Sequence, residues 1–106
     1  MIRDGLIQRF EFTFEISHKL LKRYLRENAP SADNVDDMSF AEVVRMGNEN
    51  GLFLGNWPRW RQYREMRSRT SHTHNETIAI DVVAGIPAFL DDARYLRDQL
   101  RQRWTG

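Results

Sequence analysis

Two long stretches of helical periodicity constrain the fold of this chain more than any other feature of its sequence. In residues 3–28 apolar side chains recur at steps of three and four, with a gap at Ser17 and His18 and no internal glycine or proline after Gly5. That stripe consists of Ile7, Phe10, Phe14, Leu21 and Leu25, widened by Leu6, Leu20 and Tyr24. Residues 76–104 carry a second stripe, made of Ile78, Val82, Val83, Ile86, Phe89, Ala93, Leu96 and Leu100. Both stretches are predicted to be helices with one buried face.

The first helix should end near Asn28, and the polar residues 29–38 should form a loop. Ser39 and Glu42 match a capping box, in which the hydroxyl accepts from the third helical N–H and the carboxylate reaches back. A short helix is therefore predicted from there to about residue 50. Gly51 should end it with a left-handed backbone.

A third helix should follow the apolar connection 51–56, with a cap at Asn56 or Trp57 and Pro58 in its first turn. It should end near Thr70. Its core-facing side chains should be Trp57, Trp60, Tyr63 and Met66.

The last helix should begin at Thr73 or Asn75, with Glu76 completing a capping box with Thr73, and it should bend at Pro87. No alternating strand pattern appears. The sequence therefore predicts one all-α domain over residues 1–106, an antiparallel up-and-down bundle of the four-helix type.

Composition excludes several classes of protein. No apolar run approaches the roughly 18 residues of a membrane span, the N-terminus lacks a signal-peptide pattern, and there is no cysteine. These features fit a cytoplasmic protein without disulfides. The net charge is only +1, but 14 of the 16 basic residues are arginine, and five of them crowd into eleven residues: Arg59, Arg61, Arg64, Arg67 and Arg69. Arginine matches phosphate geometry, although a solvated helix face explains the cluster equally well.

The segment MRSRTSHTHNE, residues 66–76, places His72 five residues after Arg67. In a continuous helix the two side chains would lie on different faces, but Thr70 and Ser71 are typical of a helix end, where an imidazole can fold back toward the guanidinium. Imidazole can move a proton while guanidinium stabilises charge on a phosphate. A histidine that simply caps the helix carbonyls would give the same pattern.

A metal or cofactor site is not indicated. His72 and His74 could chelate, but zinc needs three or four ligands, His18 is the only other histidine, and neither Glu76 nor Asp81 is singled out. No phosphate-binding glycine loop and no metal-dependent nucleotidyltransferase motif is present. His18 lies on the apolar side of the first helix, where a core or interface role is the usual one.

Three blocks of sequence resemble the nucleotidyltransferase substrate-binding proteins of the HEPN superfamily. They are IRDGLIQRFEFTFEISHKLLKRYL (2–25), SFAEVVRMGNENGL (39–52), and the pattern W-x6-R-x4-H-T made by Trp60, Arg67, His72 and Thr73, together with Thr70-Ser71. They occur in the family's order and cover nearly the whole chain.

The resemblance implies a helical bundle that forms a homodimer and a partner, a minimal nucleotidyltransferase encoded nearby. Related pairs are toxin–antitoxin modules in which the HEPN member is a metal-independent ribonuclease that uses R-x4-H. Carried to this chain, Arg67 would hold the phosphate of RNA and His72 would act as general acid or base. Positions that would assist catalysis or bind phosphate are Arg64, Ser68, Arg69, Thr70, Ser71, Thr73 and His74.

The chain departs from the family pattern at several positions. His74 stands where toxin relatives often have a tyrosine that the partner modifies, Ser68 replaces a frequent Asn or Asp, and His18 replaces a tryptophan. Relatives usually have another helix before the first block. Its absence should leave part of the Phe10 and Phe14 stripe uncovered, for use by a dimer or a partner. Two functions therefore stay open: a ribonuclease, or a non-catalytic subunit that binds a nucleotide or substrate for a separate nucleotidyltransferase.

Overall fold

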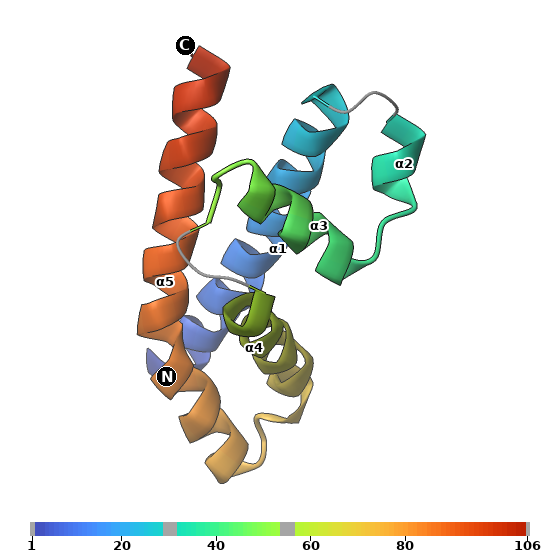
Figure 1. The fold of residues 1–106 in the computed structure, drawn as a ribbon. Coiled ribbons are helices and arrows are strands. Elements are labelled where there is room, and N and C mark those ends of the chain that lie inside the picture. Colours follow the sequence, from blue (N-terminus) through green and yellow to red (C-terminus); the bar gives the residue numbers. More distant parts are fainter. Residues whose placement is uncertain (1, 29–31, 54–56, 106) are drawn as a thin grey trace.

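The computed structural model describes residues 2–28, 32–53 and 57–105, and within these ranges every regular element is helical (Figure 1). The elements are α1 (Ile2–Asn28), α2 (Ala32–Asp36), α3 (Phe40–Glu49), α4 (Trp57–Arg69), the short 3-10 turn η1 (Thr70–His72) and α5 (Glu76–Thr105). The four predicted helices and the all-α fold class are confirmed. Among these helices, none is long and apolar enough to cross a membrane.

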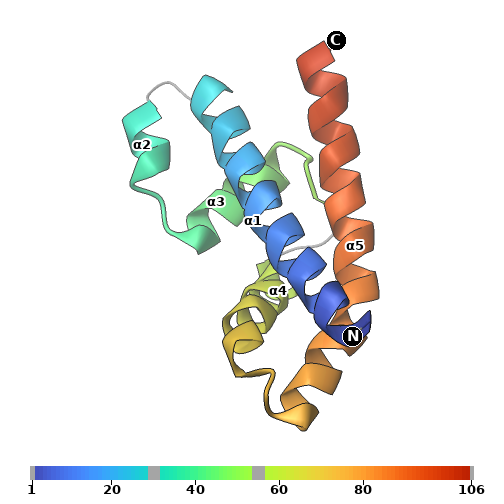
Figure 2. The same cartoon turned by 180° about the vertical axis from the view of Figure 1, so that it is seen from behind.

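Successive long helices alternate in direction, so that α1 and α5 run the same way with α4 running against both (Figures 1 and 2). Contacts near the two ends of the pair confirm that α1 and α5 are parallel: Phe10 meets Phe89, and Tyr24 meets Trp104. The α4–α5 pair is antiparallel, because Tyr63 contacts Asp92 while Arg69, further along α4, contacts Asp81. The helix α3 packs against both α1 and α4.

An aromatic cluster forms the centre of the core, around the fully buried ring of Phe89. The edge-to-face neighbours of Phe89 are Phe10 and Tyr63, with ring centroids 4.9 and 5.2 Å away, and Trp60 at 6.2 Å. Edge-to-face pairs add about 0.5–1.5 kcal/mol to the burial of their area. The cluster therefore fixes α1, α4 and α5 to one another.

Side-chain caps set the predicted helix ends, with two adjustments. At Ser39 the hydroxyl accepts from the Glu42 N–H at 3.2 Å, and the Glu42 carboxylate accepts from the same hydroxyl at 3.3 Å. Gly51 has a φ of +73°, as predicted. The last helix uses Asn75, whose Oδ1 accepts from the N–H of Ile78 at 3.2 Å. The predicted Thr73–Glu76 box does not form, because the Thr73 hydroxyl donates to the carbonyl of Thr70 instead.

The predicted loop 29–38 contains a helix, α2, and in this respect the prediction was wrong. Val35 is fully buried beneath α1, and its carbonyl accepts from the N–H of Met38 at 3.1 Å. Burial of one valine fixes a helical turn in a segment whose composition is otherwise that of a loop. The predicted cap at Asn56 and the side chain of Trp57 lie outside the described residues.

The expected uncovered stripe lies on another face of α1. Phe10 and Phe14 are buried, whereas Leu6, Phe12 and Ile16 are exposed. Opposite them, α5 continues through Pro87, and its first third runs at an angle to the rest in both views (Figures 1 and 2).

Candidate active site

The R-x4-H motif lies where α4 ends and the chain turns into α5. Three hydroxyls end the helix by donating to carbonyls three residues earlier: Thr70 to Arg67 at 2.6 Å, Ser71 to Ser68 at 3.1 Å, and Thr73 to Thr70 at 3.2 Å. Such local bonds compete with the helical pattern and tighten the last turn. The predicted helix end at Thr70-Ser71 is therefore confirmed, and Thr70 itself is buried.

Two carboxylates of α1 hold the guanidinium of Arg67. Its Nη1 lies 3.2 Å from Oε2 of Glu11 and donates to the Thr70 hydroxyl at 3.0 Å, while its Nη2 donates to Oε1 of Glu15 at 2.5 Å. The hydrogen bond from Arg67 and then its charge lower the pKa of Glu15. Because Glu11 and Glu15 are four residues apart, they project from the same side of α1. The motif arginine is thereby fixed in orientation and its charge is offset.

His72 and His74 are exposed beside this clamp, with their ring centroids 6.2 Å apart in an edge-to-face arrangement. The carbonyl of His72 accepts from the N–H of Asn75 at 3.0 Å, which fixes the backbone of the turn. Among the described residues, the ion pairs and hydrogen bonds of the Arg67 side chain go to Glu11, Glu15 and Thr70 rather than to His72. The expected folding of the His72 ring onto Arg67 is not observed in the single chain.

Most of the arginine cluster is already engaged. Arg69 pairs with Asp81 at 3.2 Å, and Arg61 pairs with Glu65 at 3.4 Å. The guanidinium carbon of Arg64 lies 5.3 Å from the centre of the Phe40 ring. The cluster is thus not an open basic surface. A nucleic acid that approaches it has to exchange protein partners for phosphate.

A shallow depression adjoins the motif between α1 and the turn. It is lined by Asp4, Ile7, Gln8, Glu11, Thr70 and Thr73. The sequence gave no sign of Glu11 or Glu15 here, because they precede Arg67 by more than fifty positions and resemble many other acidic residues. Their four-residue spacing on the polar edge of α1 is the single available signal. Ser68 and Ser71 are exposed at the rim of the turn.

A second polar network, also missed from the sequence, joins α4 to α5. Asp92 is 1% exposed, accepts from the Tyr63 hydroxyl, and lies 2.8 Å from Nη2 of Arg59. Burial, and after it the hydrogen bond to Asp92, raises the pKa of Tyr63 to about 12. This network lies in the core and supports the helix that carries the motif.

A parallel α1–α5 pair, an intervening α4 and an arginine–histidine turn between α4 and α5 define a class of small helical proteins. The model of one family, described as nucleotidyltransferase substrate binding protein like, matches residues 1–102. The chain belongs to this family.

Two similar proteins come from Haemophilus influenzae. One is named "Probable ribonuclease HepT" and is 40% identical over 99 residues, which is 93% of this chain and 67% of the relative. The other is a solved structure described as revealing the fold of a substrate binding domain of a nucleotidyltransferase. It is 38% identical, with a TM-score of 0.89 over 93% of this chain and 73% of that one. The two descriptions differ in the function they give to the fold.

Proposed function

We propose that this protein is a metal-independent endoribonuclease whose active groups are Arg67 and His72, and that it is the HEPN-type toxin of a toxin–antitoxin pair with a minimal nucleotidyltransferase. The observation that carries the proposal is the fixed arginine beside an exposed histidine turn. Glu11, Glu15 and Thr70 orient Arg67, while His72 is open to solvent a few residues away. The similarity to a protein named as a ribonuclease supports it.

The chemistry requires groups for proton transfer and for charge. The 2′-hydroxyl of RNA loses its proton to a base and attacks the adjacent phosphorus, the bond to the 5′-oxygen breaks, and that oxygen takes a proton from an acid. The products are a 2′,3′-cyclic phosphate and a 5′-hydroxyl. Imidazole can serve as base or acid, and a guanidinium offsets the charge that develops on the phosphate. Single-stranded RNA suits this reaction because its backbone can reach the in-line geometry.

The electrostatics of the site favour a homodimer. Two carboxylates accompany one guanidinium, so a single copy of the site offers a phosphate little net positive charge. A second copy that presents its own Arg67 and His72 would supply the missing charge and a second imidazole. One histidine would then act as base while the other acts as acid.

RNA cleavage by the purified protein in EDTA tests the proposal. Cleavage that leaves 2′,3′-cyclic ends should survive EDTA and disappear in His72→Ala. His74→Ala is the matched control, since it removes an exposed imidazole two residues away. Cleavage that needs a divalent cation, or that persists in His72→Ala, would contradict the assignment.

A second function has specific support and belongs to another class. The arginine is already neutralised by two acids, Ser68 and His74 depart from the usual motif, and the solved relative is described as a substrate binding domain. In that case Arg67 and His72 bind the phosphate of a nucleotide or other substrate for a separate nucleotidyltransferase. Growth arrest on expression without a partner favours the ribonuclease, and its absence favours the binding subunit.

A further inference from the structure

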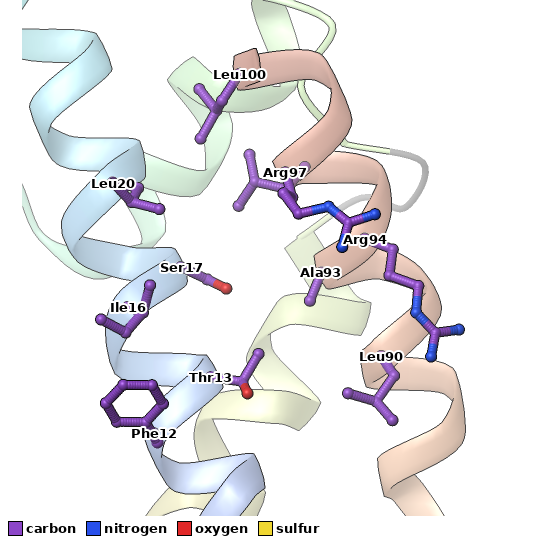
Figure 3. A pocket seen from close by; sticks show the side chains of 11 residues that line it. Phe12, Thr13, Ile16, Ser17, Leu20, Leu90, Ala93, Arg94, Arg97 and Leu100 are labelled. Atoms are coloured by element: carbon purple, nitrogen blue, oxygen red, sulfur yellow. The ribbon is translucent and has the colours of Figure 1, made fainter.

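An apolar groove runs between α1 and α5 on the side of the molecule away from α4. Its main cavity has a volume of about 350 Å³. Figure 3 shows Phe12, Ile16 and Leu20 on the α1 wall, with Leu90 and Leu100 on the α5 wall. Phe12 is 67% exposed, which is unusual for a phenylalanine in the middle of a helix. An open apolar surface of this kind is typical of an interaction site.

The groove continues beyond this cavity. A second depression shares Phe12, Thr13, Leu90 and Arg94 with the first and extends it to Gly5. On α1 the lining thus reaches from Gly5 to Leu20, about 22 Å at the rise of an α-helix. That length corresponds to about four helical turns.

The shape of the groove suits a helix. Small side chains lie low in it, namely Thr13, Ser17 and Ala93 (Figure 3), so the backbone of an added helix can approach closely. Since α1 and α5 are parallel, a helix laid between them can run antiparallel to both, which favours the alignment of its dipole. A helix in such a groove is held by apolar anchors at steps of three and four residues.

The charge of the groove specifies the partner further. Among the described residues that line it, the charged ones are Arg9, Arg94 and Arg97, all basic. Two copies of this chain joined groove to groove would bring like charges together, which disfavours a second copy as the occupant. We propose that the α1–α5 groove binds an amphipathic helix of a partner protein, with acidic residues beside its apolar stripe. This proposal is independent of the ribonuclease assignment, because its residues lie outside the R-x4-H site.

A designed peptide serves as the probe. It is about 18 residues long, with leucines at helical spacing and glutamates on both flanks, and carries a fluorescent label for anisotropy. Phe12→Asp should weaken its binding about tenfold or more. Ile80→Asp is the matched control, because Ile80 is exposed on α5 but does not line the groove. Circular dichroism should show both variants folded, and Ile16→Gln provides a milder second change in the groove.

A charge exchange makes the test specific. Replacing Arg94 and Arg97 together by Glu should weaken binding of the glutamate-flanked peptide and strengthen that of a lysine-flanked version. Three results would overturn the proposal. They are equal binding of a scrambled peptide, equal effects of Phe12→Asp and Ile80→Asp, and a dimer that dissociates on Phe12→Asp without any peptide, which would place a second copy in the groove.

Discussion

Arg67 has two carboxylate partners in the folded chain, and this pairing has consequences for RNA. Glu11 and Glu15 restrict the rotamers of a long side chain, and they also compete with phosphate for its donors. They are therefore positioning residues that raise the order of the site while lowering its affinity. The two effects can be separated experimentally.

Replacing both Glu11 and Glu15 by Gln should tighten binding of a short RNA and lower its cleavage rate. Removal of two negative charges strengthens attraction to phosphate, and the salt dependence of binding should steepen. A less ordered guanidinium stabilises the transition state less well, so kcat should fall while KM also falls. Glu27→Gln is the control, since Glu27 lies near the opposite end of α1. Parallel losses of affinity and rate would show that the two acids act in another way.

Tyr63→Phe should destabilise the protein by about 1–3 kcal/mol, because the buried Asp92 loses the hydroxyl that donates to it. In the wild type, the raised pKa of Tyr63 means that the stability from its protonated form is complete below pH 10 and is lost as pH rises toward about 12. Urea unfolding at several alkaline pH values checks both points. A variant as stable as the wild type at neutral pH would contradict this role for the network.

His18 should make the fold sensitive to acid. Burial lowers its pKa, with smaller contributions from the charges of Lys22 and Arg64, and its ring lies 5.3 Å from that of Phe40. Below a pH of about 6.5 the unfolded chain takes up a proton at His18 that the folded chain resists, so stability falls as pH falls. His18→Phe should reduce the difference in unfolding free energy between about pH 7.5 and about pH 5. An unchanged difference would exclude this cause.

At the scale of elements, the helix α3 approaches its neighbours closely at one glycine. A Cβ at Gly47 would lie 2.6 Å from Cε2 of Phe53 and 3.2 Å from Cδ1 of Leu21, both buried side chains. Gly47→Ala should therefore cost about 1–3 kcal/mol by overpacking. Thermal unfolding measures the loss.

Gly85→Ala is the matched change. There the new Cβ would meet the Sδ of Met66 at 2.7 Å, at the flexible end of a half-buried side chain that can move away. Its helix propensity should offset the contact, so the variant should be about neutral or slightly stabilised, by up to about 1 kcal/mol. Equal losses at the two glycines would contradict this assignment of the close contact.

The elements also show which features could be predicted from sequence. Periodic apolar residues and local caps define α1, α3, α4 and α5, because both signals act within a few residues. The helix α2 escaped prediction because its formation depends on burial of Val35, a tertiary contact. Glu11 and Glu15 escaped it for the same reason, since 15 acidic residues were available and their meeting with Arg67 depends on how α1 packs against α4.

At the scale of the whole molecule, the parallel α1 and α5 separate two surfaces. The motif turn and its acidic clamp lie where α4 meets α1, and the apolar groove lies between α1 and α5 on the other side. This arrangement lets one small bundle bind RNA on one surface and a helical partner on another. It follows from the number and direction of the helices, which sequence predicts only when the helix count is known.

The most direct measurement of the central claim compares RNA cleavage and RNA binding for the same His72→Ala protein. Single-turnover cleavage reports the chemical step, and anisotropy with a non-cleavable RNA reports affinity. If His72 is a general acid or base, cleavage should fall about 10²–10⁴-fold while affinity stays within a few fold. A wild-type protein that binds RNA or nucleotide without cleaving it, and that loses affinity in His72→Ala, would contradict the ribonuclease and establish the motif as a binding site.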